Sequence, residues 1–240
     1  MLGEFIRGTR YFLLGLSRLK TKGLRRFILL PIIFNFLLFV GLFYFAYNYL
    51  LSYAQYFINL LPSWLSFLHW LFIVFFCISF LFIFLVTFTV LFNLVASPFN
   101  GLLAEKAQRL FYHSDIPSLP FLKTACRSMK RQGKFLWYFF PRFLGVTILF
   151  FIPFIHPAFP FIWFLFNSWI LSIQYLDFVM DNNLVGFKEM QNKIREKRMV
   201  SLGFGCCISL VSIIPFLNLI TIPAAVIGGV IFYQNEFKEI

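Results

Sequence analysis

The sequence has few charged residues. Charged side chains make up 12% of its 240 residues, about half of the roughly 25% that is usual in soluble domains. No Asp, Glu, Lys or Arg occurs between Arg26 and Glu105, whereas an uncharged apolar run of about 18 residues already suggests a membrane-spanning helix. This scarcity excludes an ordinary soluble helical bundle. Hydrophobic residues instead make up 60% of the chain, and they predict an integral membrane protein.

The motifs of common enzymes are absent as well. The sequence has no Walker A motif, no His-Glu-x-x-His and no Gly-x-Ser-x-Gly, and Gly203-Phe204-Gly205 does not complete a dinucleotide fingerprint. His69, His113 and His156 are separated from one another and from carboxylates, which favours packing or interfacial roles over metal binding. We therefore expect no catalytic residues, no metal site and no cofactor.

Cysteine is also scarce. Cys77, Cys126, Cys206 and Cys207 lie mostly within or beside apolar stretches, and their spacing suggests neither a disulfide framework nor a zinc site. We interpret all four as small hydrophobic core residues.

Basic residues outnumber acidic ones by 21 to 9, which gives a formal net charge of +12. They stand in blocks that flank the hydrophobic segments, as the positive-inside rule predicts. This arrangement argues against a nucleic-acid partner and for membrane topology. The same excess of positive charge would raise the concentration of anions near the mouth of a pore.

The first 22 residues are predicted to form an interfacial amphipathic helix rather than a cleavable signal peptide. Charged residues at five positions interrupt any hydrophobic core that a signal peptide would need. Apolar clusters alternate with these charges, which is typical of a helix lying in the membrane interface. The five positions are Glu4, Arg7, Arg10, Arg18 and Lys20.

Two long helices are predicted at residues 23–51 and 64–104, joined by a turn that contains Pro62. The uncharged part of the first, residues 27–51, would be about 37 Å long as a helix. This length exceeds the roughly 30 Å hydrocarbon core of a bilayer. A basic interfacial segment follows at residues 105–142, in which Pro117 and Pro120 suggest a break between two helical pieces.

Two further uncharged runs, residues 143–176 and 199–235, are predicted to be hairpins broken by proline. The first contains Pro153, Pro157 and Pro160, and the second contains Pro215 and Pro223. Because basic blocks flank the first run on both sides, the chain must cross the membrane an even number of times or turn back within it. Paired interrupted segments of this kind are also typical of transport proteins. The predicted fold class is an all-α integral membrane protein with a single domain, residues 1–240.

The motif Gly23-Leu24-Arg25-Arg26 precedes the first long run. If a helix begins at Gly23, the amides of its first turn lack intrahelical partners. A helix amino-terminus favours anions, and arginine offers donors that match a tetrahedral oxyanion. These residues are therefore a candidate sulfate or phosphate site. The alternative is an ordinary juxtamembrane basic cluster.

A second motif runs from Ser97-Pro98 to Glu105. Ser97 and Pro98 read as a helix start, so capping is a sufficient explanation for them. Glu105 is the first acid after the uncharged run and could gate an anion path. A carboxylate in that position needs a cationic partner, and the sequence does not identify one.

Four segments resemble the bacterial CysZ sulfate transporters, and the chain is more distantly similar to the etoposide-induced membrane protein family. Their order and spacing match over essentially the whole chain, and the run from Ala96 to Glu105 is the most specific. The segments are Gly23-Leu24-Arg25-Arg26-Phe27, Ala96-Ser97-Pro98-Phe99-Asn100-Gly101-Leu102-Leu103-Ala104-Glu105, Trp163-Phe164-Leu165-Phe166 with Ile173-Gln174-Tyr175, and Phe187-Lys188-Glu189-Met190.

The resemblance implies an inner-membrane sulfate permease that supplies cysteine synthesis. It also implies two long spanning helices, two pairs of hemi-penetrating helices and assembly as a homo-oligomer. In that family the glycine-leucine-arginine motif binds sulfate, which corresponds to Gly23, Leu24, Arg25 and Arg26 here. The family is associated with opposed orientations in the membrane, whereas the charge distribution predicts a single orientation.

Neutral polar residues are the candidates for lining a deeper pathway, although each has packing as an alternative role. Glu105 and Asp177 could act at its edges, and without a carboxylate or histidine cluster at the membrane centre we expect channel-like movement rather than a proton relay. The neutral candidates are Asn35, Asn93, Asn100, Asn167, Ser168, Ser172, Gln174, Asn218 and Thr221.

A different class of function is also compatible with the sequence. The basic blocks could hold anionic membrane lipid and the hairpins could recruit partners, as in a membrane-embedded scaffold. A membrane enzyme is the third possibility and is disfavoured by the missing catalytic motifs. Sulfate flux by the purified protein in liposomes would separate the permease from the scaffold.

Overall fold

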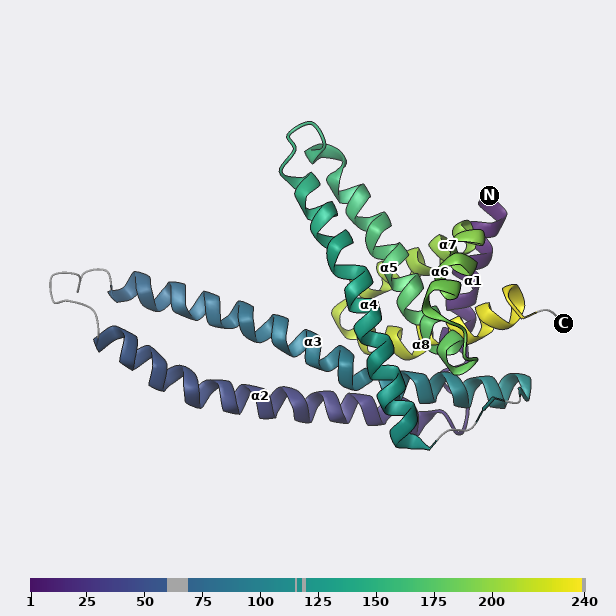
Figure 1. The fold of residues 1–240 in the computed structure, drawn as a ribbon, viewed down its shortest axis with the longest axis horizontal. Coiled ribbons are helices and arrows are strands. Elements are labelled where there is room, and N and C mark those ends of the chain that lie inside the picture. Colours follow the sequence, from purple (N-terminus) through teal and green to yellow (C-terminus); the bar gives the residue numbers. More distant parts are fainter. Residues whose placement is uncertain (60–68, 115, 118–119, 239–240) are drawn as a thin grey trace. The chain divides into compact units, whose positions relative to one another are not determined.

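The computed structural model describes residues 1–59, 69–114, 116–117 and 120–238, and the side chains of Arg26 and Asn35 are among those outside this description. All regular structure in the described ranges is helical, as the sequence predicts (Figure 1). The helices are α1 Leu2–Ser17, α2 Arg25–Asn59, α3 His69–Tyr112, α4 Phe121–Phe150, the short 3-10 helix η2 His156–Ala158, α5 Phe159–Asn182, α6 Phe187–Glu196, α7 Arg198–Ser212 and α8 Pro215–Glu236.

The chain forms two compact units. Unit 1 contains Met1–Leu30 and Ser97–Ile240, and unit 2 contains Pro31–Ala96. Unit 2 therefore holds most of α2 and the first part of α3, and unit 1 holds the remaining helices together with the start of α2 and the end of α3. The candidate residues named above fall in unit 1, apart from Asn35 and Asn93 in unit 2.

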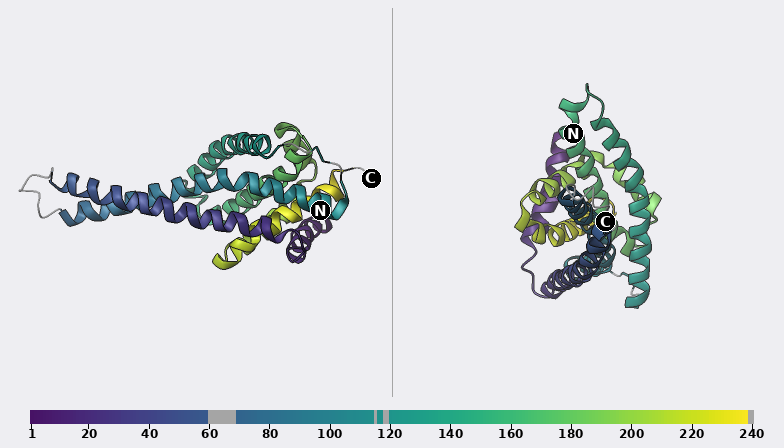
Figure 2. Two further views of the ribbon diagram at one scale, coloured as in Figure 1. Left: turned by 90° about the horizontal axis from the view of Figure 1, so that it is seen from below. Right: turned by 90° about the vertical axis from the view of Figure 1, so that its left-hand side faces the viewer.

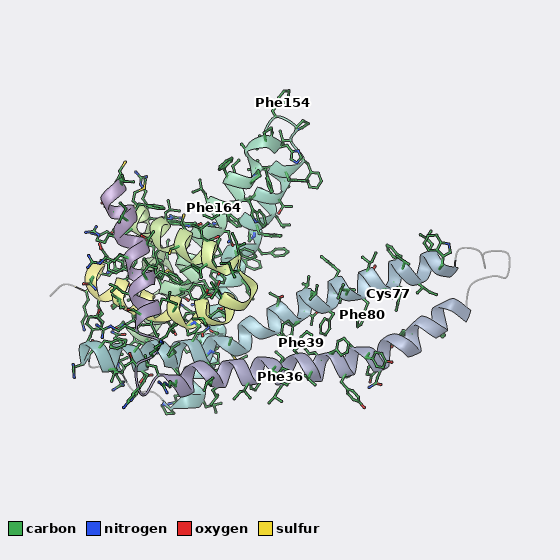
Figure 3. The ribbon with its side chains drawn as sticks, turned by 180° about the vertical axis from the view of Figure 1, so that it is seen from behind. Phe36, Phe39, Cys77, Phe80, Phe154 and Phe164 are labelled. Carbon is green, nitrogen blue, oxygen red and sulfur yellow. The ribbon has the colours of Figure 1, made fainter. Side chains whose placement is uncertain are left out.

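Unit 2 consists of two antiparallel helices held together by aromatic side chains. The Phe39 ring of α2 lies 5.8 Å from Phe84 and 5.4 Å from Phe88 of α3, both in edge-to-face geometry. Figure 3 labels Phe36 and Phe39 on the first helix and Cys77 and Phe80 on the second. Most large apolar side chains described on these helices are exposed. Exposing this apolar surface to water would cost about 25 cal/mol of free energy for each Å². The two helices of unit 2 are therefore suited to contact with lipid.

Two helical stretches are long and apolar enough to cross a membrane, Ile73–Tyr112 and His156–Asn182. In α2 the described apolar portion is Phe36–Tyr49. One expectation about the first of these stretches, Ile73–Tyr112, is wrong. Ser97-Pro98 does not start a new helix, because Pro98 lies inside α3, which continues to Tyr112. The Ser97 hydroxyl donates instead to the Ser128 carbonyl of α4 (3.3 Å).

Unit 1 is built around α5, which packs against α4, α6, α7 and α8, while α1 packs against α7 and α8. Figure 2 shows α1, in purple, beside the yellow α8. Phe12 of α1, Phe204 of α7 and Phe232 of α8 are all fully buried in this core. Gly205 sets the spacing between α7 and α5, because a Cβ there would overlap the Ser168 carbonyl oxygen.

A buried carboxylate fastens α1 to the rest of unit 1. Glu236, at the end of α8, receives a hydrogen bond from Tyr11 (2.8 Å) and an ion pair from Arg7 (2.9 Å), and Lys197 lies 3.6 Å away. Burial, together with the neighbouring carboxylate, raises the pKa of Tyr11 above its ordinary value, so its phenol stays a hydrogen-bond donor. The helix predicted at residues 1–22 is thus observed at Leu2–Ser17 and is anchored on one face.

Each proline-containing run includes a turn between two helices, but the predicted boundary at residues 142 and 143 is wrong, because α4 runs without a break from Phe121 to Phe150. The chain turns between α4 and α5 at residues 151–158, which include Pro153 and Pro157. Phe154 lies at the tip of this hairpin and is 96% exposed (Figure 3). The turn between α7 and α8 falls immediately before Pro215, which is the first residue of α8. Pro223 lies inside α8, so the expectation that it also divides the second run is wrong.

Candidate anion-binding site

The turn that leads into α2 requires a glycine. The amide of Thr21 donates to the Arg18 carbonyl (3.1 Å), and that of Leu24 donates to the Thr21 carbonyl (3.3 Å). Within this turn Gly23 has a φ of +98°, a conformation that residues with a Cβ adopt only at a cost. Apart from its two chain neighbours, no atom of the described residues lies within 4 Å of the position that a Cβ would occupy. The backbone at Gly23 is therefore open to an approaching ligand.

The residue after the glycine fixes the position of the turn. Leu24 is fully buried in the core of unit 1, whereas its neighbour Arg25 is exposed. Because α2 begins at Arg25 and the Leu24 amide is already bonded, the free amides of the first turn begin at Arg25, two residues later than the sequence suggested. Of the two arginines, Arg26 has its side chain outside the described residues.

The turn is also held against the end of α3. The guanidinium carbon of Arg18 lies 5.4 Å from the centroid of the Phe111 ring, in a cation–π contact. The Arg18 carbonyl accepts a second hydrogen bond from the Thr21 hydroxyl (2.7 Å). Arg18 therefore joins the basic turn to α3 within unit 1. Asn100 and Glu105 belong to the same helix, α3.

Glu105 has a cationic partner that the sequence did not identify. The Arg109 Nε donates to Glu105 Oε1 (3.0 Å), and Arg109 Nη2 donates to the Ile116 carbonyl (2.8 Å). The pair lies one turn apart on α3 and is partly exposed. Glu105 is therefore compensated in charge and does not present a bare carboxylate to an anion.

Asp177 is likewise paired, in the interior of unit 1. Arg131 of α4 contacts Asp177 Oδ1 through Nε (2.8 Å) and Nη2 (2.7 Å), and both side chains are about nine-tenths buried. One turn away, Arg127 Nε donates to Asp181 Oδ2 (3.1 Å). The two pairs form a ladder between α4 and α5. Sequence reasoning missed Arg127, Arg131 and Asp181 as partners, although the matched spacing of four residues in each helix was an available signal.

Amide side chains join the end of α3 to the end of α5. Asn182 Nδ2 donates to the Gly101 carbonyl (2.7 Å), and Gln108 and Asn183 exchange hydrogen bonds of 3.1 and 3.0 Å. Asn100 is buried next to Gly101. Asn100, Glu105 and Asp177 therefore all belong to the α3, α4 and α5 packing of unit 1.

Several of the neutral pathway candidates have structural partners. Asn167 of α5 donates to the Ser209 hydroxyl of α7 (2.9 Å). Ser168 and Thr221 each donate to the carbonyl of a residue one turn earlier in their own helices. Packing and interhelical bonding account for these three. The side chain of Asn35 lies outside the described residues.

The comparison with known proteins is consistent over nearly the whole chain. The family described as "Sulfate transporter CysZ/Etoposide-induced protein 2.4" matches residues 11–223. A protein of Pseudomonas fluorescens named "Sulfate transporter CysZ" is 37% identical over 240 residues, which is 98% of this chain and 96% of that protein. Proteins of the same name from Pectobacterium atrosepticum and Vibrio atlanticus are 35% and 36% identical; each match covers 97% of this chain, and 86% and 94% of those proteins.

Proposed function

Since the chain belongs to the sulfate transporter CysZ and etoposide-induced protein 2.4 family, we propose that it is a sulfate transporter of the bacterial inner membrane that supplies sulfate for cysteine biosynthesis. The observation that carries the proposal is the turn at Gly23, which exposes backbone beside Arg25 at the start of α2. The family's name describes a transporter, and we propose no catalytic role for any residue.

Capture of sulfate would begin at this turn. The free amides of the first turn of α2 and the guanidinium groups of Arg25 and Arg26 replace part of the hydration shell of the dianion. Burial of Leu24 keeps the turn in place when the ligand leaves. Binding has to stay weak enough for release, because a transport site must empty as well as fill.

Beyond the turn, the paired carboxylates would act as gates. Glu105 and Asp177 are each compensated by an arginine, so neither repels an arriving anion strongly. Arg127 Nη1 is buried and has no hydrogen-bond partner among the described residues, which leaves a donor free for an anion. Movement is channel-like in this scheme, with Asn100 and Asn35 as further lining candidates.

In the membrane arrangement that we propose, the two long helices α2 and α3 cross the membrane. The α4–α5 and α7–α8 hairpins enter the bilayer and turn back at their prolines, and α1 lies at the interface. Irregular backbone at the hairpin tips is tolerated if protein or an aqueous cavity surrounds it, which is the reason we propose assembly as a homo-oligomer.

Equilibrium binding of sulfate to the purified protein tests the site. We expect the double variant Arg25→Ala, Arg26→Ala to bind sulfate at least about tenfold more weakly, because hydrogen bonds to charged groups contribute roughly 1.5–3 kcal/mol each. The matched control is Arg195→Ala with Arg198→Ala, which removes two exposed arginines elsewhere in unit 1. Varying chloride separates specific capture from screening.

Unchanged binding in the Arg25, Arg26 variant would return these residues to the role of topology anchors and move the search to Asn100 and Glu105. Sulfate flux into liposomes that contain only the purified protein then tests transport itself. Anionic-lipid binding without flux would instead support a scaffold.

A further inference from the structure

A second basic surface lies on α4 and shares no residue with the turn at Gly23. It is an open groove of about 730 Å³ between α4 and α6, two helices labelled in Figure 1. Its cationic members are Lys130, Lys134 and Arg142, and its aromatic members are Trp137, Tyr138 and Phe187. The α4 residues recur at intervals of three or four and therefore share one face of the helix.

The positive charge of this groove is not compensated. Lys130 and Lys134 are exposed, and neither forms an ion pair or hydrogen bond with another residue of the described chain. The acids on neighbouring elements are already engaged, since Asp177 pairs with Arg131 (2.7 Å) and Glu189 with Lys193 (3.7 Å). The groove is consequently a place where an anion would be stabilised.

Aromatic rings hold Arg142, the third cation, in place and line the groove. The Arg142 guanidinium carbon lies 3.7 Å from the Tyr138 ring centroid, and Arg142 Nη1 donates to the Tyr138 carbonyl (2.7 Å). The rings of Tyr138 and Phe187 meet edge to face, with centroids 6.2 Å apart. The Arg142 side chain is therefore held in place before any ligand arrives.

One end of the groove opens onto apolar surface. Trp137 is 84% exposed, and further along α4 the exposed side chains include Phe140, Leu144 and Ile148. From Arg142 to Phe150, where α4 ends, the helix rises about 12 Å, roughly two-fifths of the about 30 Å hydrocarbon core of a bilayer. A small inorganic anion would use only the cations, whereas an amphiphile with an anionic headgroup would use both parts.

We propose that this groove binds the headgroup phosphate of an anionic phospholipid, with an acyl chain lying along the exposed face of α4 beyond Trp137. Lys130 and Lys134 contact the phosphate, Arg142 supports it from the Tyr138 ring, and Trp137 lies at the junction of headgroup and chain, as interfacial tryptophans do. The site shares no residue with the proposed sulfate-binding turn, so the lipid site and the sulfate site can be tested independently of each other.

Quenching of tryptophan fluorescence by phospholipids with brominated acyl chains tests the proposal in detergent micelles. The difference between the wild type and Trp137→Phe isolates the signal of Trp137. We expect brominated phosphatidylglycerol to quench this signal at a much lower mole fraction than brominated phosphatidylcholine. Because each lysine near an anionic surface contributes roughly a fivefold gain in affinity, we expect Lys130→Gln with Lys134→Gln to weaken phosphatidylglycerol binding by about ten- to thirtyfold.

The matched control is Lys106→Gln with Lys123→Gln, which removes the same charge from exposed positions outside the groove. An equal loss in this control, or equal quenching by both lipids, would overturn the proposal. Competition by sulfate beyond that of sodium chloride at the same ionic strength would identify a free-anion site instead. No quenching of Trp137 by either lipid would indicate that a second copy of the chain covers the groove. Sulfate binding by the Lys130, Lys134 variant is expected to remain unchanged.

Discussion

Single residues carry two distinct electrostatic roles in this protein. Arg25 is exposed at an open turn and is available to a ligand, whereas Arg131 is buried and committed to Asp177. The difference follows from desolvation, because a buried charge must be paired while an exposed one is solvated by water. Positive charge alone therefore does not identify the anion site. What distinguishes the turn at Gly23 is exposed backbone next to Arg25, a cation with no ion pair among the described residues.

The buried pair leads to a stability prediction at this scale. Arg131→Met leaves Asp177 as an unpaired buried carboxylate, and we expect a loss of about 3–5 kcal/mol in the free energy of unfolding. The double variant Arg131→Met, Asp177→Leu should recover most of that loss, since no charge is then left unpaired. Thermal unfolding in detergent measures both.

The partly exposed pair Glu105 and Arg109 supplies the control. We expect Arg109→Met to cost only about 0–1 kcal/mol through its ion pair. If Arg131→Met and Arg109→Met proved equally mild, the Arg131 pair would not be a buried, desolvated pair in the folded protein.

At the scale of the helices, small residues decide how closely elements of unit 1 approach. A Cβ at Gly8 of α1 would overlap the Val200 carbonyl oxygen of α7, and a Cβ at Gly203 of α7 would overlap the Phe5 carbonyl oxygen of α1. A Cβ at Gly205 would likewise overlap the Ser168 carbonyl oxygen of α5. Glycines that could be read as fragments of a nucleotide-binding motif are thus contact points between helices, as is common where helices pack in membranes.

Gly205→Ala tests this interpretation. The added Cβ would overlap the Ser168 carbonyl oxygen, so α5 and α7 must move apart, and we expect a loss of about 1–3 kcal/mol, the usual cost of overpacking. Gly41→Ala is the matched control, because, apart from its chain neighbours and the backbone of its own helix, no atom in the described part of the chain lies within 4 Å of its Cβ position, and alanine is the better helix former. Equal unfolding temperatures for the two variants would contradict close packing at Gly205.

At the scale of the whole molecule, the proposed topology depends on hairpins that enter the bilayer without crossing it. The tip of the α4–α5 hairpin carries the most exposed of the large apolar side chains named here, Phe154. Its exposure is favourable only if the tip lies in lipid or against another copy of the chain. The basic ends of both hairpins would then stay on one side of the membrane.

A spin label at Phe154→Cys tests this topology in liposomes. We expect its relaxation to respond to oxygen, which concentrates in the bilayer interior, and to be insensitive to a water-soluble nickel chelate. Lys188→Cys at the start of α6 serves as the control and should show the opposite preference. The native cysteines are first replaced by serine. Cys77 and Cys126 are exposed, so the interpretation of all four cysteines as core residues is wrong for these two. A tip that responds to the nickel chelate from either side would contradict the hemi-penetrating arrangement.

The sequence by itself determined the membrane class, the helical fold and the family. These features depend on local composition and on how each segment partitions between water and lipid, both of which can be read along the chain. The tertiary structure decided where α2 begins, because burial of Leu24 fixes the turn. It also decided that α3 continues through Pro98, and that Asp177 is paired with Arg131, 46 residues away along the chain. Contacts of that range depend on how the helices pack, which no local pattern specifies.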